Sequence, residues 1–214
     1  MVFATLTFAG QDDIIAAIDR AQLARDEQLL SYTVTEHYTL KNIRFGTAAD
    51  LIADVTYTKG SGKVYKVVSR SGSAMMQSKV FDRVLAEEAE MSRGDKRRAA
   101  LIISSNYVMK LSGEQEWNSR RALLLDITPR RKGPNLLKGR LWVDAVNYNV
   151  IRIEGTPVVS PSFFTGSTTL FREYADIGDF AFAQTSVATS GSLLLGKTEM
   201  NIEYTGYQIQ LEKR

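Results

Sequence analysis

The sequence predicts a mainly β (α+β) protein, with a large curled antiparallel sheet and two or three helices on its concave side. Ten or eleven short runs alternate apolar and polar residues, which is typical of strands with one buried face. Short turns join most of these runs, and no strand–helix–strand rhythm appears, which argues against a Rossmann or other parallel fold. Two stretches have a helical period instead, and a large twisted sheet buries its apolar face by curling around such helices.

Composition bounds the size and the chemistry of the protein. With 214 residues, of which 44% are hydrophobic and 24% charged, the chain suits one globular domain. It has no cysteine and a single histidine, His37, which excludes disulfides, thiolate nucleophiles, iron–sulfur clusters and sites that need two imidazoles. The net charge of +3 does not demand a nucleic-acid partner. These features favour a binding or carrier protein over an enzyme, with no metal and no cofactor.

The first ten residues differ from the rest of the chain. The segment 1–10 is apolar and uncharged and ends in small residues before Gln11, like the tail of a secretory signal sequence without its basic start. We therefore expect 1–10 to be a truncated or partly removed signal sequence and 11–214 to be the exported domain. The alternative is a disordered or strand-like N-terminus. No apolar run is long enough for a transmembrane helix.

A helix is expected from Asp12 or Asp13 to Leu29 or Leu30. Asp12 can cap its first turn, where acidic residues also suit the helix dipole. An isolated amphipathic helix must lay its apolar face on another surface, and the strands that follow supply one. The apolar face is formed by Ile14, Ile15, Ile18 and Ala21.

Strand patterns begin at residue 31. In 31–40 the alternation places Glu36 on the apolar face, where a lone carboxylate is costly, so it needs a basic partner or a wet cavity rim. The turn 60–62 joins 51–57 to 64–68 as a hairpin; a phosphate-binding loop would open a helix instead. Later strands are expected near 107–111, 123–127, 141–145, 150–154, 167–175, 180–190 and 196–208.

A helical insert of about 73–104 interrupts the strands. Its apolar residues recur at helical spacing, and Glu87, Glu88 and Glu90 are expected on the opposite, solvated face rather than in a metal site. Methionine and phenylalanine on mobile elements are common where a protein accepts variable apolar ligands, although such residues can also simply complete a core. The residues expected to line a hydrophobic cavity are Met76, Val80, Phe81, Val84, Leu85, Trp142, Phe163 and Phe164.

Polar motifs carry little chemistry. His37 alternates with threonines on the polar side of its strand, and catalysis would require a nucleophile and an orienting acid that the sequence does not place. The basic tracts 96–98 and 130–132 lie in loop-like sequence without the interleaved aromatic residues of a base-stacking surface. They are expected to be solvated loops or to contact lipid head groups or a partner protein, and not nucleic acid.

Three segments together resemble a known family. They are 125–132 (LDITPRRK), 139–144 (GRLWVD) and 150–155 (VIRIEG). This succession of a strand ending near a proline and basic residues, a "WVD" strand, a tight turn and a further strand resembles bacterial outer-membrane lipoprotein-sorting proteins of the LolA/LolB-like superfamily. The local motifs cover about 125–155, and the order of elements matches over nearly the whole chain.

The resemblance implies a half-open barrel around the helices, with a hydrophobic cavity that accepts acyl chains in the periplasm. It also implies that the insert covers this cavity as a lid. The expected function is a non-catalytic carrier or chaperone for lipids or lipoproteins. Such a carrier is expected to be monomeric, with inner- and outer-membrane proteins as partners. The alternative is an envelope regulatory or structural protein of the same fold whose main ligand is another protein.

Overall fold

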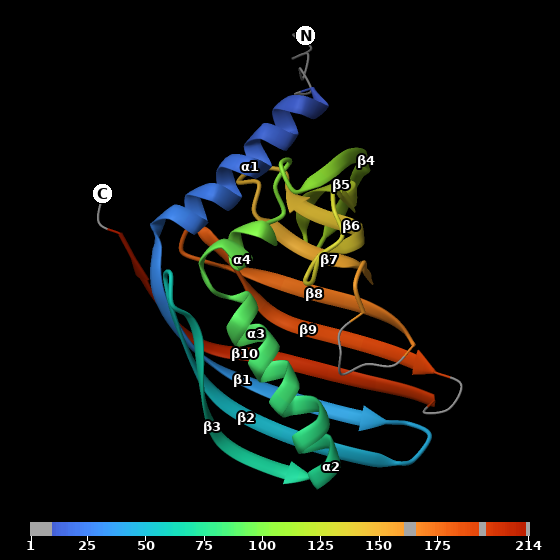
Figure 1. Cartoon of the computed structure of the whole chain (residues 1–214). Coiled ribbons are helices and arrows are strands. Elements are labelled where there is room, and N and C mark those ends of the chain that lie inside the picture. Colours follow the sequence, from blue (N-terminus) through green and yellow to red (C-terminus); the bar gives the residue numbers. More distant parts are fainter. Residues whose placement is uncertain (1–9, 161–165, 193–195, 213–214) are drawn as a thin grey trace, which may run out of the picture.

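The computed structural model describes residues 10–160, 166–192 and 196–212. In these ranges, ten strands form one antiparallel sheet in the order β3-β2-β1-β10-β9-β8-β7-β6-β5-β4, and the sheet curls without closing (Figure 1). The predicted fold class is confirmed. The strands are β1 (Leu29–Asn42), β2 (Thr47–Thr58), β3 (Gly62–Gly72), β4 (Tyr107–Trp117), β5 (Arg120–Pro129), β6 (Leu137–Asp144), β7 (Val150–Pro157), β8 (Ser167–Ile177), β9 (Phe180–Ser192) and β10 (Gly196–Leu211).

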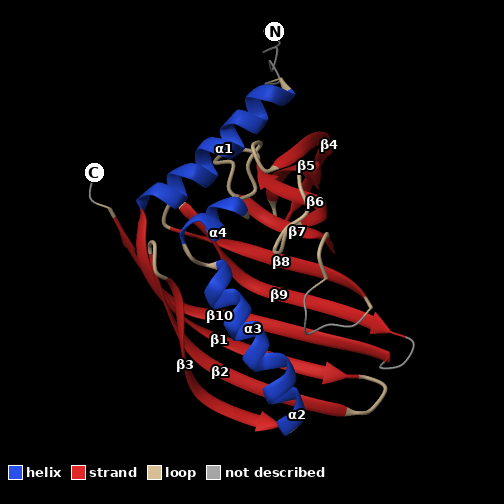
Figure 2. Ribbon diagram, in the orientation of Figure 1, coloured by secondary structure: helices blue, strands red, loops and turns tan. Residues whose placement is uncertain are grey.

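The helices lie on the concave side of this sheet (Figure 2). Because β3 and β4 are the two edges of the sheet, the chain that connects them must cross the opening of the half-barrel. That connection is the helical insert predicted near 73–104. Within the described part of the chain the helical segments are α1 (Gln11–Gln28), α2 (Ala74–Met76), the π-helical turn η1 (Gln77–Phe81), α3 (Asp82–Met91) and α4 (Gly94–Ala99).

Helix α1 begins and ends within two residues of its predicted limits. The carboxylate of Asp13 accepts the backbone N–H of Gly10 (3.2 Å), and Leu29 leaves the helix with extended backbone angles. Ile14 and Ile18 are buried against the strands β4 to β7. This packing supplies the covering surface that an isolated amphipathic helix requires.

The insert predicted near 73–104 is not one regular helix. It contains the turn η1, where the buried amide of Gln77 donates to the backbone carbonyls of Asp50 (2.9 Å) and Ser71 (2.7 Å). The tract 96–98, expected in loop-like sequence, belongs instead to the short helix α4. The insert is thereby fastened to β2 and β3 at the point where it leaves the sheet.

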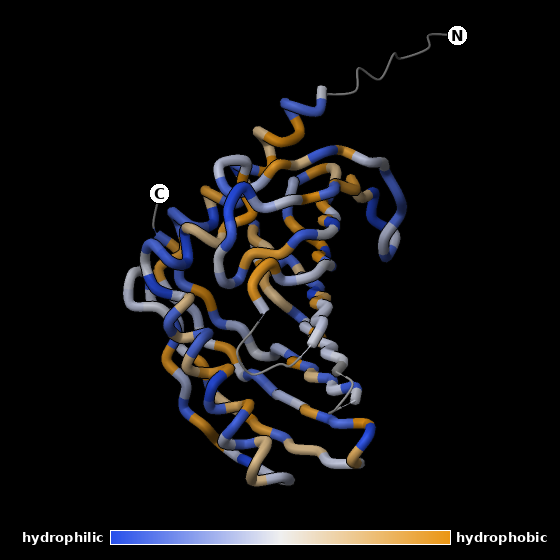
Figure 3. Tube along the Cα trace, turned by 45° about the vertical axis from the view of Figure 1, so that its right-hand side comes forward, coloured by the Kyte–Doolittle hydropathy of each residue, from blue (hydrophilic) through white to orange (hydrophobic). Residues whose placement is uncertain are grey.

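Two large apolar clusters pack the helices onto the concave side of the sheet. In one, Phe81 and Val84 of the insert pack on β1, β2 and β10. In the other, α1 packs on β4 to β7. Figure 3 shows apolar and polar positions alternating along the strands, as a sheet with one covered face requires.

Candidate functional site

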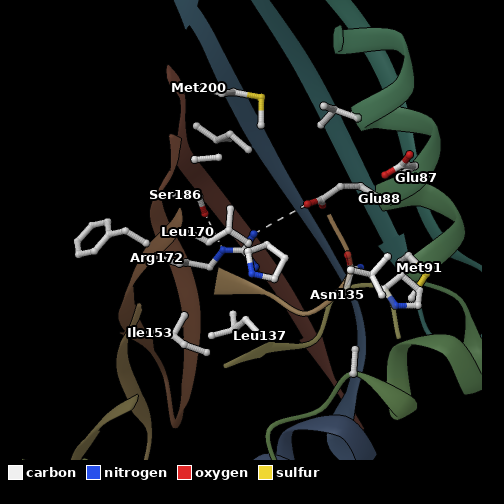
Figure 4. Close-up of a pocket in the computed structure, with 18 of the residues that line it drawn as sticks. Glu87, Glu88, Met91, Asn135, Leu137, Ile153, Leu170, Arg172, Ser186 and Met200 are labelled. Atoms are coloured by element: carbon white, nitrogen blue, oxygen red, sulfur yellow. Dashed lines mark hydrogen bonds and ion pairs between the residues drawn. The ribbon is translucent and has the colours of Figure 1, made fainter. Parts of the chain in front are cut away.

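A cavity of about 740 Å³ lies between α3 and the concave face of β7 to β10. This volume is in the range of small-molecule sites, which are mostly apolar with a few placed polar groups. Both apolar clusters contribute to its wall, so the cavity occupies the space that they leave between them. Apolar residues of the wall include Val84, Leu137, Ile153, Leu170, Met200 and Ile202 (Figure 4).

The pairing register explains why these side chains meet. Residues directly opposite each other on neighbouring strands point to the same face of a sheet. Ile153 pairs with Arg172, and Arg172 pairs with Ser186, which gives one row across β7, β8 and β9. Leu170 pairs with Ala188, which continues a second row beside the first. The cavity floor is therefore apolar except where Arg172 and Ser186 interrupt it.

A buried ion-pair cluster borders the cavity. Glu36 is 1% exposed, and it pairs with Lys63 (3.1 Å) and accepts a hydrogen bond from the Tyr38 hydroxyl. The sequence predicted that this inward carboxylate needs either a basic partner or a wet cavity rim, and the structure shows the basic partner, Lys63. Lys63 follows the predicted turn 60–62 directly; it is the second residue of β3 and lies opposite the buried Tyr57. That pairing places its ammonium group inside the half-barrel.

Glu88 was expected on a solvated helix face, and this expectation is wrong. Its carboxylate accepts from Lys63 (2.7 Å) and from the Tyr65 hydroxyl (3.3 Å). Burial acts to raise the pKa of Glu88, but Lys63 and Arg172 outweigh it and lower the pKa to about 2. The sequence did contain a signal for this inward position: Glu88 follows the apolar Val84 by four residues, which puts both on one helix face. Glu90 does face outward, where it pairs with Arg93 (3.1 Å).

Arg172 carries the positive charge on the cavity floor. Its Nε donates to the Ser186 hydroxyl (2.6 Å), which lies 3.3 Å from the Tyr204 hydroxyl. Its Nη2 is 3.9 Å from a Glu88 carboxylate oxygen, the contact that Figure 4 marks across the cavity. No pattern in the sequence marks Arg172 as a site residue. Its position within the run 167–175 gave no sign of which face it occupies, because the expected alternation there is broken by polar residues.

Most of the predicted cavity-lining residues lie elsewhere. Val84 lines the cavity. Met76, Phe81 and Leu85 are instead buried in the cluster with β1, β2 and β10, and Val80 packs against that cluster. For these four the structure matches the alternative that they complete the core. Two further predicted residues lie outside the described part of the chain, namely Phe163 and Phe164.

Trp142 does not line the cavity either. Its neighbours in β6, Leu141 and Val143, pack on the α1 side, so Trp142 points to the opposite face of the sheet. There the guanidinium carbon of Arg152 lies 4.7 Å from the Trp142 ring centre and 4.4 Å from that of Trp117. The expected role of Trp142 in the cavity is therefore corrected to one in an outer aromatic cluster.

The two basic tracts have partners within the protein. Arg97 and Arg98 belong to α4, not to a loop, and both pair with the buried Asp26 of α1. Arg130 donates to the backbone carbonyl of Ser104 (2.7 Å), and Arg131 donates to that of Ala99. The tract 96–98 is therefore helical rather than loop-like, whereas 130–132 lies in a loop with Arg131 and Lys132 exposed, as expected. The contacts tie the end of the insert to α1 and to the loop after β5.

The other polar groups that the sequence raised as candidates do not gather into a site in the part of the chain that the structure describes. His37 lies 3.5 Å from Asp50, with both side chains close to half exposed on the outer face of the sheet. No group of three potential metal ligands occurs among the residues that the structure describes. None of the helices in those same ranges has the length and hydropathy of a membrane span.

An open, curled sheet with helices across its concave side and an apolar cavity beneath them defines a half-barrel binding fold. No protein-family model matches the sequence, and no curated protein matches it. Among solved structures, the chain is similar to a LolA superfamily protein from Nitrosomonas europaea, with 10% identity, a TM-score of 0.53 and 94% of each chain covered. It is also similar to a domain assigned to outer-membrane lipoprotein sorting from Vibrio parahaemolyticus. That match has 13% identity and a TM-score of 0.53 and covers 90% of this chain and 91% of the other. At these identities the likeness shows the fold, which is LolA-like as predicted.

Proposed function

We propose that the protein is a non-catalytic carrier or chaperone that shields the acyl chains of a lipid or lipoprotein in the cavity of its half-barrel. The observation that carries this proposal is the apolar cavity of about 740 Å³ between α3 and the sheet. The LolA-like fold supports it, because the similar proteins include a domain assigned to lipoprotein sorting. Fold alone does not fix function, so the proposal rests on the cavity.

Burial of alkyl chain is sufficient to drive such binding. Each methylene transferred from water to an apolar site contributes about 0.8 kcal/mol. Val84, Leu170 and Met200 offer aliphatic surface for this purpose. The insert that crosses the opening would shield the chain from water. No bond needs to be made or broken, which is why we assign no catalytic residue.

A carrier of this kind would work in the periplasm. The apolar segment 1–10 resembles the end of a secretory signal sequence, which supports export. Partner proteins in the inner and outer membranes would then deliver and receive the ligand. Fractionation of cells that express the tagged full-length protein tests this location, and recovery in the cytoplasmic fraction would contradict it.

The binding function is tested by native mass spectrometry of the gently purified protein and by titration with a dansyl-labelled undecanoic acid. We expect co-purified lipid and saturable binding of the probe. Leu170→Asp places a carboxylate in the cavity wall and should weaken probe binding at least tenfold. Val146→Asp is the matched control, because Val146 is 85% exposed in the turn after β6.

Each outcome of this experiment decides between stated functions. Equal binding by Leu170→Asp and Val146→Asp would place the probe outside the cavity. Absence of both co-purified lipid and probe binding in the unmodified protein would refute the carrier. It would favour the alternative of an envelope protein whose main ligand is another protein, and a defined partner in a pull-down would support that alternative.

A further inference from the structure

Arg172 is a positive charge on the floor of a largely apolar cavity. Ile153 and Leu170 lie beside it in the same wall, and Figure 4 shows its guanidinium group reaching toward α3. Its side chain is 38% exposed although it belongs to the concave face of the sheet. A cation set in a largely apolar wall offers its terminal nitrogens to an opposite charge on a ligand.

The nearby carboxylates are already engaged by another cation. Lys63 lies between Glu36 (3.1 Å) and Glu88 (2.7 Å) and holds both. The 3.9 Å between Arg172 and Glu88 is longer than a hydrogen bond. The bond from its Nε to Ser186 fixes the guanidinium group and turns its terminal nitrogens toward the cavity.

We propose that Arg172 binds the head group of an amphiphile that carries a single negative charge and whose alkyl chain occupies the cavity. This inference rests on the proposed carrier function and specifies its ligand. The planar guanidinium matches carboxylate and phosphate oxygens in a two-pronged geometry. A single charge is specified because Glu88 lies 3.9 Å from Arg172 and, with Glu87 on the same helix, would repel a more negative head group.

The surroundings keep Arg172 charged. Burial acts to lower the pKa of Arg172, but Tyr204, Tyr174 and Glu88 outweigh burial and raise the pKa well above its ordinary value. The cation is therefore present at every pH at which the protein is folded. Binding of a carboxylate should then fail only when the carboxylate itself becomes protonated, near its own pKa.

The test compares the dansyl-labelled undecanoic acid with its methyl ester, which has the same chain and no charge. The unmodified protein should bind the acid at least tenfold more tightly than the ester. In Arg172→Gln the affinity for the acid should fall at least tenfold, while that for the ester stays the same. Arg140→Gln, which removes an exposed arginine from the outer face of β6, is the control for net charge and should change neither.

Displacement experiments identify the head group. Palmitate and lysophosphatidylglycerol each carry one negative charge, on a carboxylate and on a phosphodiester respectively. Displacement of the probe by either compound supports the proposal. The compound that displaces the probe at the lower concentration shows whether a carboxylate or a phosphodiester is preferred. Equal affinity of the unmodified protein for acid and ester would overturn the role of Arg172 and leave the carrier function standing. If the unmodified protein binds neither the acid nor the ester, both the carrier function and the role of Arg172 are refuted. The ratio of its affinities for acid and ester tests the role of Arg172 even if Arg172→Gln does not fold.

Discussion

At the scale of single residues, the buried charges organise the interior. Lys63 joins two carboxylates that come from different parts of the chain, Glu36 on the sheet and Glu88 on the insert. Because Lys63 has two partners, the loss of one carboxylate weakens this set but leaves the ammonium group paired with the other. The sequence singled out Glu36 because the alternation of its strand places it inward. It could not reveal Lys63, because the inward direction of that residue depends on the pairing of β3 with β2.

Glu88 should make stability fall steeply in acid. Its pKa in the folded protein, about 2, is below the ordinary 4.5, so the stabilisation from its charged form is complete above about pH 4.5 and is lost as the pH falls toward 2. Glu88→Gln should lower the free energy of unfolding by about 2 kcal/mol at neutral pH and flatten its decline in acid. Urea denaturation at a series of pH values measures this. The control is Glu116→Gln at an exposed position of β4, and an identical acid slope in the two variants would contradict the prediction.

At the scale of elements, the insert is held at both ends and packed in its middle. At its start, η1 is fastened to β2 and β3 through Gln77. At its end, Arg97 and Arg98 of α4 pair with Asp26 of α1. The helical period predicted this element, but neither the π-helical turn nor α4. Both depend on long-range partners, and periodicity reports only which side of a helix is apolar.

Loss of the first fastening should loosen the insert locally. Gln77→Leu removes two hydrogen bonds to β2 and β3 and should lower the free energy of unfolding by about 1–3 kcal/mol. Amide hydrogen exchange in 74–81 should quicken more than exchange in β9. The control is Ser78→Ala in the same turn, whose exposed hydroxyl donates only to carbonyls of the preceding turn. Unchanged exchange in 74–81 would show that packing of Phe81 alone holds the insert.

At the scale of the whole molecule, the two faces of the sheet carry different sets of side chains. The concave face holds the helices, the buried charges and the cavity, and the outer face of β5 to β7 holds the aromatic cluster around Trp142. The sequence predicted the fold class, the order of elements and most strand positions, because these follow from local periodicity. The site was predicted less well. Apolar character marks a residue as buried, but whether it fills the core, as Phe81 does, or borders a cavity, as Val84 does, depends on how the sheet curls.

Because the cavity and the tryptophans lie on opposite faces of the sheet, we expect tryptophan fluorescence not to change when a ligand binds in the cavity. The chain has two tryptophans, and both Trp117 and Trp142 lie in the outer cluster. Saturation with palmitate, which is not fluorescent, should leave the emission maximum unchanged, whereas urea unfolding should shift it to longer wavelength. A clear shift on palmitate binding would mean either that the ligand lies on the outer face or that the sheet changes curvature when it is loaded.

The position of β10 in the sheet has a consequence for how the chain acquires its structure. β1 pairs with β10, and the hydrogen bond from Asn42 to Thr198 joins residues 156 positions apart. Closing so long a loop costs more entropy than forming a hairpin, and folds rich in distant contacts form slowly. During synthesis, β1 to β3 and β4 to β9 can each assemble by local hairpins. The two parts can join into one sheet only when β10 has been made, because β10 lies between β1 and β9. Until β10 pairs, β1 and β9 both present unpaired edges, so this interval is the period of greatest exposure to aggregation.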